Sequence, residues 1–199
     1  KKNIFVSGSI VIDYIKKIKI LSKSELENKY KFFFNKRNFL LTYHPETINL
    51  KNNKKNINTI LKTLVSFDNS KIFICRPSND PGSDDIMRAI NAYRKKYKKK
   101  IKFFDLLGMY YYISLASYCD FVIGNSSSGL SEIPSIGVPT INLGNRQQGR
   151  PRARSVINCK IDFKSINKAI FKILNKKVLI NKKNPFYKKN SLQLIKQKI

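Results

Sequence analysis

Short, continuously apolar runs alternate with amphipathic segments along almost the whole length of this chain. Runs such as FLLTY, KIFIC and FVIG show no polar–apolar alternation, which is typical of parallel strands covered by helices on both faces. The expected strands are residues 4–7, 39–43, 71–76, 101–104, 120–124, 139–143 and 155–159. This order of elements restricts the chain to layered α/β architectures.

The segments between the runs have helical periodicity. Within 56–67, the apolar residues at i, i+3, i+4 and i+7 form one stripe, and they are Ile57, Ile60, Leu61 and Leu64. Ser83 is expected to cap another helix, which ends in RKKYKKK as the helix dipole favours. Further helices are expected over 110–118, 163–174 and 191–199. This alternation predicts a doubly wound, Rossmann-like parallel sheet, and 199 residues suit one domain.

The charge of the chain is strongly unbalanced. Forty Lys and Arg residues against twelve Asp and Glu residues give a formal charge of +28, a feature of many nucleic-acid-binding proteins. The lysines, however, are spread over nearly every segment beside Asn and Ile, as the codons of an AT-rich genome would produce. Acidic surface on a part of the protein absent here would also balance the excess. We therefore expect no nucleic-acid partner.

Cysteine and histidine content argues against a metal site. Cys75, Cys119 and Cys159 form no CxxC pair, and His44 is the only histidine. We interpret the thiols as buried and free in a reducing cytoplasm. The most apolar stretch, 109–124, is shorter than a bilayer span, so no membrane partner is expected. The chain begins at Lys1 and enters the strand-like NIFVSG at once, so we interpret it as a piece of a longer polypeptide.

A serine-rich turn follows the expected strand 120–124. Ser126, Ser127 and Ser128 lie between two glycines, and LSEIPSIG then starts a helix. Hydroxyls and unpaired N–H groups at a helix N-terminus favour a phosphate ligand. Glu132 lies one turn further on and adds to this interpretation. An ordinary serine N-cap is the structural alternative.

Other strand ends carry polar residues as well. Strand 139–143 leads into Arg146 and three further arginines, whose forked donors suit diphosphate oxygens, although a solvated basic loop is the alternative. His44 follows strand 39–43 and is either a ligand contact or a structural histidine. Ser78, Asn79 and Asp80 follow strand 71–76 in what reads mainly as a polar turn. Because ligands of doubly wound sheets bind beyond the carboxyl ends of the strands, we expect these side chains to build one crevice.

These motifs carry a resemblance to a known family. GNSSSGLSEIPSIGVPTINLGNRQQGR, with TYHPET upstream, resembles the hydrolysing UDP-N-acetylglucosamine 2-epimerases, which feed sialic and related nonulosonic acid synthesis. The non-hydrolysing branch instead carries an Asp-Ser-Gly-Gly loop and a Thr-His-Arg-Arg stretch, and this chain has neither. The family has the two-domain GT-B fold in a longer chain. The resemblance therefore implies that residues 1–199 are a single UDP-binding domain, the carboxyl-terminal half of an enzyme whose amino-terminal half is absent.

The resemblance also implies a reaction and roles for individual residues. UDP is eliminated through a 2-acetamidoglucal, which is hydrated to N-acetylmannosamine or a related diacetamido sugar. By this resemblance Ser126, Ser127 and Arg146 hold the diphosphate and Glu132 holds the ribose hydroxyls. His44 is the catalytic residue on this half and assists the departing UDP. The remaining substrate-binding residues expected from these motifs are Ser128, Gln147, Ser78 and Asn79.

The implied partners are the UDP-sugar substrate, the amino-terminal domain of the same enzyme and further copies of the full-length protein, with no cofactor. Two departures from the family pattern concern the site. Ser78 stands where the family usually has Asn, which Asn79 could replace, and NPFYKKNS lacks the glycines and the acid of the family's loop. Two alternatives stay open: the UDP-sugar-binding half of a GT-B glycosyltransferase, and a basic nucleic-acid-binding module.

Overall fold

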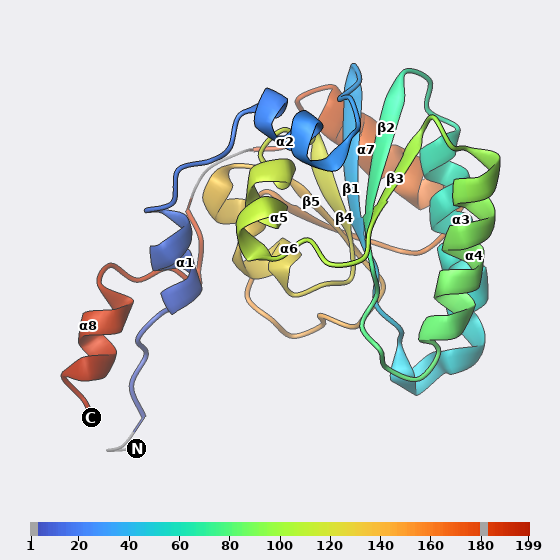
Figure 1. The fold of residues 1–199 in the computed structure, drawn as a ribbon. Helices are drawn as coiled ribbons and strands as arrows, with labels where there is room; N and C mark the ends of the chain where they lie inside the picture. The colour runs from blue at the N-terminus through green and yellow to red at the C-terminus, as the bar shows by residue number, and fades with distance from the viewer. Residues whose placement is uncertain (1–3, 180–182) are drawn as a thin grey trace.

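Six of the apolar runs form one parallel sheet in the computed structural model, which describes residues 4–179 and 183–199 (Figure 1). The strands are β1 Arg37–Thr42, β2 Ser70–Cys75, β3 Ile101–Phe104, β4 Phe121–Gly124, β5 Thr140–Leu143 and β6 Val156–Cys159. Their order across the sheet is β3-β2-β1-β4-β5-β6, and each neighbouring pair is parallel. The prediction of a doubly wound α/β fold is confirmed.

Helices connect most of the strands and cover the sheet, whereas β5 leads to β6 through a loop. They are α1 Ile10–Ile15, α2 Lys23–Tyr30, α3 Asn53–Val65, α4 Ser83–Lys96, α5 Met109–Ala116, α6 Ser128–Ser131, α7 Phe163–Leu174 and α8 Ser191–Lys196, with 3-10 turns η1 Thr47–Asn52 and η2 Ile133–Ile136. The helices expected from periodicity are present. None of the described helices is long and apolar enough to cross a bilayer.

The continuous apolar runs fill a core on each face of the sheet. Within β1, Phe39 and Leu41 pack with α3, α4 and α7, whereas Leu40 packs on the opposite face with α2 and α5. All three side chains have no exposed surface. Successive residues of a strand point to opposite faces, so a strand that is covered twice needs an apolar side chain at every position. Figure 1 shows the two helical layers, with α3 and α4 on one side and α5 and α6 on the other.

The strand order places a topological switch point between β1 and β4. The chain moves outward from β1 through β2 to β3, crosses back, and continues outward from β4 through β5 to β6. Phe39 of β1 pairs with Phe121 of β4, and Thr42 pairs with Gly124 at the carboxyl ends. Ligands of doubly wound folds bind in the crevice at such a point.

Three local expectations were wrong. Residues 4–7 do not form a strand, because they leave the sheet and run beside 186–188, where the Ser9 N–H donates to the Phe186 carbonyl at 2.8 Å. Ser83 does not cap α4: the N-cap is Gly82, with φ 91°, which has no side chain to accept a capping hydrogen bond. The helix after the serine turn is one short turn, α6, followed by η2 because Pro134 interrupts the α-helical hydrogen bonding.

Candidate functional site

The carboxyl ends of four strands bring most of the expected site residues to one edge of the sheet. His44 follows β1, Ser78 follows β2, Ser126 follows β4 and Arg146 follows β5. Since the strands are parallel, these residues lie beyond the same edge. His44 and Ser126 are at the switch point between β1 and β4.

Asn125 joins these strand ends and was not expected from the sequence. It is fully buried. Its side chain accepts the His44 N–H at 2.7 Å and donates to the His44 carbonyl at 2.9 Å. Its own carbonyl accepts Arg146 Nη1 at 3.2 Å and Gln147 Nε2 at 2.8 Å. One residue therefore ties the loops after β1, β4 and β5 together.

The imidazole of His44 contacts the loop after β2. Its Nδ1 accepts the Ser78 N–H at 3.0 Å. Burial lowers the pKa of His44, the Arg146 cation lowers it further, and Asp80 acts in the opposite direction. His44 is therefore held as a neutral imidazole near pH 7.

The serine turn is ordered by hydrogen bonds among its own hydroxyls. Ser128 Oγ donates to Ser126 Oγ at 3.1 Å, and Ser128 Oγ also pairs with the Tyr112 hydroxyl at 2.9 Å. Ser127 is the N-cap of α6 and is exposed, and its own side chain makes no capping hydrogen bond. The Ser128 N–H donates instead to Ser126 Oγ at 3.4 Å. Gly124 opens the turn with φ 146°, and a Cβ built there would lie 1.9 Å from the Thr42 carbonyl oxygen. Only glycine lets β4 end this close to β1.

A cavity of about 400 Å³ adjoins this turn on the side of β2 and β3. Its lining includes Thr42, Tyr112, Ser128, Glu132 and Leu107. Burial raises the pKa of the Tyr112 hydroxyl far above its ordinary value, so it stays protonated. The Thr42 hydroxyl oxygen is buried without a hydrogen-bond partner among the described residues. The cavity thus combines apolar walls with a few polar groups, as small-molecule sites do.

The loop between β5 and β6, residues 144–155, carries four arginines and is called the arginine loop here; only part of it contacts the site. Arg146 is exposed apart from its contact with Asn125, and Gln147 is buried. Arg150, Arg152 and Arg154 are exposed. Arg146 also borders a second hollow of about 560 Å³, together with Glu46, Asp80 and Asn145.

The two remaining expected contacts lie in the loop after β2. The Ser78 hydroxyl donates to Asp80 Oδ2 at 2.6 Å. Asn79 is exposed and lines neither the 400 Å³ nor the 560 Å³ hollow. The structure therefore brings Ser78 beside His44 through its main chain rather than through its hydroxyl.

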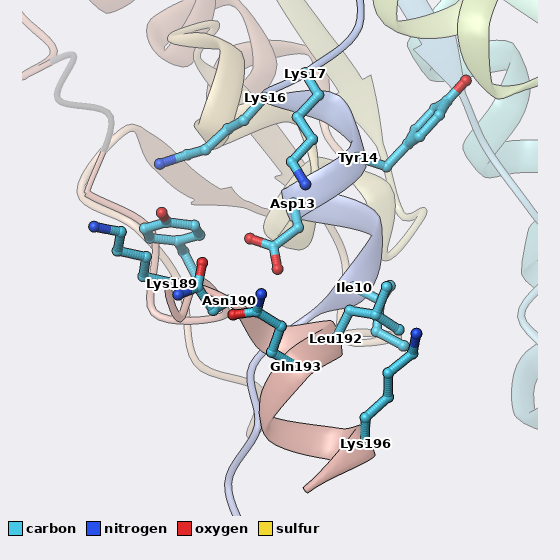
Figure 2. Close-up of a pocket in the computed structure, with 11 residues that line it drawn as sticks. Ile10, Asp13, Tyr14, Lys16, Lys17, Lys189, Asn190, Leu192, Gln193 and Lys196 are labelled. Carbon is cyan, nitrogen blue, oxygen red and sulfur yellow. The ribbon is translucent and has the colours of Figure 1, made fainter.

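A further opening, of about 590 Å³, lies elsewhere, between α1 and α8 (Figure 2). Asp13 points into it, with Lys16, Lys17, Gln193 and Lys196 around it. None of the expected site residues lines it. Lysines surround most surfaces of a chain with this composition, so the strand-end crevice is the better candidate.

Comparison with known proteins shows which family the sequence matches. A family model described as UDP-N-acetylglucosamine 2-epimerase matches residues 1–199. The "GDP/UDP-N,N'-diacetylbacillosamine 2-epimerase (hydrolyzing)" of Campylobacter jejuni is 38% identical over 162 residues, which are 81% of this chain and 42% of that protein. "Polysialic acid biosynthesis protein P7" of Escherichia coli is 35% identical over 194 residues, 96% of this chain and 49% of that protein. The chain spans about half the length of these relatives.

Solved structures show the same fold. The UDP-GlcNAc 2-epimerase of Neisseria meningitidis, solved bound to UDP-GlcNAc, superimposes with a TM-score of 0.73 at 18% identity, over 97% of this chain and 54% of that one. An enzyme of the same name from Methanocaldococcus jannaschii, solved with UDP-GlcNAc and UDP, has a TM-score of 0.65 at 21% identity, over 97% of this chain and 53% of that one.

Proposed function

The chain belongs to the UDP-N-acetylglucosamine 2-epimerase family, and from this we propose that it is the UDP-binding half of a hydrolysing epimerase. The proposed reaction releases UDP and forms N-acetylmannosamine or a related diacetamido sugar. Two relatives support the hydrolysing type: the 38% identical protein is named as hydrolysing, and the 35% identical one is named for polysialic acid synthesis.

The proposed ligand lies across the carboxyl ends of β1, β4 and β5. The diphosphate contacts Ser126, Ser127 and Arg146, and His44 lies beside it. Arg146 suits this role because one of its five donors is held by the Asn125 carbonyl at 3.2 Å, which leaves the others for phosphate oxygens.

The nucleoside is proposed to enter the 400 Å³ cavity. Glu132 lines this cavity beside Ser128, so its carboxylate can accept ribose hydroxyls there. Tyr112 and Leu107 supply apolar surface for the base. Ser78 and Gln147 complete the proposal as residues that shape the crevice around His44 and Arg146, and Asn79 is proposed to contact the substrate from the exposed loop after β2.

The observation that carries the proposal is the junction at Asn125. A buried side chain that pairs with both polar groups of the His44 main chain, and a carbonyl that holds Arg146, bring a neutral imidazole and a guanidinium to the switch point. A polyphosphate ligand explains why these groups lie beside a turn of three serines.

Calorimetry with UDP and UMP tests the proposal. Charge-assisted hydrogen bonds contribute about 1.5–3 kcal/mol each, so UMP should bind at least about tenfold more weakly than UDP. Equal affinities would contradict the diphosphate assignment. A parallel titration with duplex DNA over a range of salt concentrations tests the nucleic-acid alternative, because backbone binding falls steeply with salt. UDP binding should persist at salt concentrations that abolish DNA binding.

A further inference from the structure

The surroundings of His44 determine which nitrogen of its neutral imidazole carries the proton. Its Nδ1 faces the main-chain N–H of Ser78, at 3.0 Å. A peptide N–H can only donate, so Nδ1 must be the unprotonated acceptor. In a neutral imidazole the single proton then lies on Nε2.

The loop that supplies this donor is itself fixed. The Arg76 N–H donates to the Phe104 carbonyl of β3 at 3.0 Å, and the Ser83 N–H donates to the Asp80 carbonyl at 3.0 Å. Between them, the Ser78 hydroxyl donates to Asp80 at 2.6 Å. The Ser78 N–H is therefore presented to His44 by a turn that is anchored at both ends.

The main chain of His44 is fixed as well. Asn125 accepts its N–H at 2.7 Å and donates to its carbonyl at 2.9 Å. Because these two partners belong to one residue, they determine which end of the Asn125 amide is oxygen and which is nitrogen. The main chain of His44 is thus fixed by Asn125, and its imidazole is fixed by the Ser78 N–H.

We propose that Ser78, through its N–H, and Asn125, through its amide, are positioning residues that hold His44 in the Nε2–H tautomer. His44 then meets its ligand as a neutral hydrogen-bond donor and not as a base. The inference rests on the proposed function only in naming a diphosphate oxygen as the acceptor. Among the described residues, Nε2 makes no hydrogen bond of its own.

This arrangement also limits what a bound diphosphate can do to His44. An anionic ligand ordinarily favours the imidazolium. Protonating Nδ1 would place two N–H donors face to face and remove the hydrogen bond to Ser78. The charged groups that affect the ring are Arg146, which disfavours the imidazolium, and Asp80, which favours it. The departing UDP therefore leaves as an anion that accepts a hydrogen bond from Nε2 and no proton.

Nuclear magnetic resonance tests the tautomer directly, since His44 is the only histidine in the chain. In the nucleotide-free, uniformly ¹⁵N-labelled protein above the pKa of His44, Nε2 should resonate as a protonated nitrogen and Nδ1 as an unprotonated one. A scalar coupling across the hydrogen bond should connect Nδ1 with the Ser78 amide. A protonated Nδ1, or averaged shifts that show both tautomers, would overturn the proposal.

Two variants separate positioning from a general effect on folding. Ser78→Pro removes the N–H donor, whereas Ser78→Ala removes only the hydroxyl and is the matched control. The pKa of His44 should rise in Ser78→Pro relative to Ser78→Ala, and Ser78→Ala should keep the coupling to Nδ1. If Ser78→Pro does not fold, the coupling in wild type and in Ser78→Ala still decides the question.

The same spectra distinguish this inference from the proposed function. The tautomer is read without nucleotide, so a chain that shows the coupling but fails to bind UDP would contradict only the proposed function. When UDP binds, His44 should stay neutral at pH 7 and the Nε2–H resonance should shift. Conversion of His44 to the imidazolium on UDP binding would contradict the inference and leave the nucleotide site intact.

Discussion

The Arg146 guanidinium has a defined partner at the strand ends, the Asn125 carbonyl. Its neighbours Arg150, Arg152 and Arg154 are exposed. Arginine presents its donors in a rigid planar fork, whereas lysine offers a compact charge at the end of a flexible stem. Arginine and lysine therefore differ in effect where one side chain must contact the Asn125 carbonyl and a bound phosphate at the same time.

Replacing Arg146 by lysine is therefore expected to weaken UDP binding by about tenfold, because the charge is retained but the fork is lost. Isothermal calorimetry measures the change. Arg150→Lys is the matched control on the same loop and should leave the affinity for UDP unchanged. If both variants bind UDP as wild type does, Arg146 does not contact the diphosphate.

The pKa of His44 makes a second prediction at this scale. Its lowered value in the folded state arises from burial first and from Arg146 second. An unfolded histidine has a pKa of about 6.5, so on acidification the unfolded chain takes up the proton before the folded chain does. The contribution of His44 to the free energy of unfolding is present above about pH 6.5 and is lost as the pH falls toward the folded-state pKa.

Urea denaturation of wild type and His44→Gln over this pH range measures the effect. Wild type should lose more stability on acidification than the variant does, and no other histidine contributes to the difference. Parallel profiles for the two proteins would show that the pKa of His44 is not lowered by folding.

The sequence allowed the strand-end positions of the site residues to be predicted, but not the contacts that those residues make. His44 and Arg146 follow apolar runs, and a strand-end position is visible in the sequence. Asn125 was overlooked because the sequence GNSSSG does not show that the Asn125 side chain is buried while Ser127 beside it is exposed. Its partner His44 is 81 residues away, so the contact depends on β1 and β4 being neighbours.

At the scale of elements, the turn from β4 into α6 depends on Gly124. A Cβ there would lie 1.9 Å from the Thr42 carbonyl oxygen, and φ is 146°. Gly124→Ala is expected to lower the free energy of unfolding by about 3 kcal/mol or more, because β1 and β4 must separate or the turn must change shape.

Gly149→Ala is the control, measured by the same urea denaturation. Gly149 has φ 80° but no atom lies within 4 Å of a built Cβ, so only the strain of the left-handed conformation remains, about 1–2 kcal/mol. Equal losses for the two variants would mean that the close approach of β1 and β4 is not what requires glycine at 124.

The strands themselves were predictable to within about two residues at their ends, because each covered strand needs apolar side chains on both faces. The error at 4–7 has the same origin. Ile4, Phe5 and Val6 have the composition of a strand, yet they are 66%, 55% and 75% exposed. A strand also needs a free sheet edge to pair with, and composition carries no information about that edge. Likewise, Gly82 caps α4 because a left-handed turn, not a serine side chain, begins that helix.

At the scale of the whole molecule, the chain is proposed to be one half of an active site. Among the described residues, the charged or titratable groups around the crevice are His44, the carboxylates of Glu46, Asp80, Asp105 and Glu132, the Tyr112 hydroxyl, the Cys75 thiol and arginines. Epimerisation needs one proton removed at the sugar C2 and another delivered there, which requires separate positioned groups. Those groups are proposed to lie on an amino-terminal domain, in a full-length enzyme that assembles from several copies.

This chain alone is accordingly expected to release no UDP from UDP-N-acetylglucosamine, even where it binds UDP. A coupled UDP-release assay measures turnover, first with the chain alone and then with the amino-terminal half of the Campylobacter jejuni relative co-expressed. Release by the chain alone would place the acid–base groups in this half. Sugar transfer to an added acceptor, without free N-acetylmannosamine, would favour the glycosyltransferase alternative.

The switch point between β1 and β4 also affects the order in which parts of the chain can fold. As the chain emerges from the ribosome, β1, β2 and β3 with their helices are complete before β4 is synthesised. Pairing of β4 with β1 closes a long loop, a contact that forms slowly because chain entropy is lost before the contact is made. The contacts between His44 and Asn125 therefore form late in folding, and the proposed nucleotide site forms with them. A ligand that binds only when β1 and β4 are paired, as proposed for UDP, would shift that late equilibrium toward the native state.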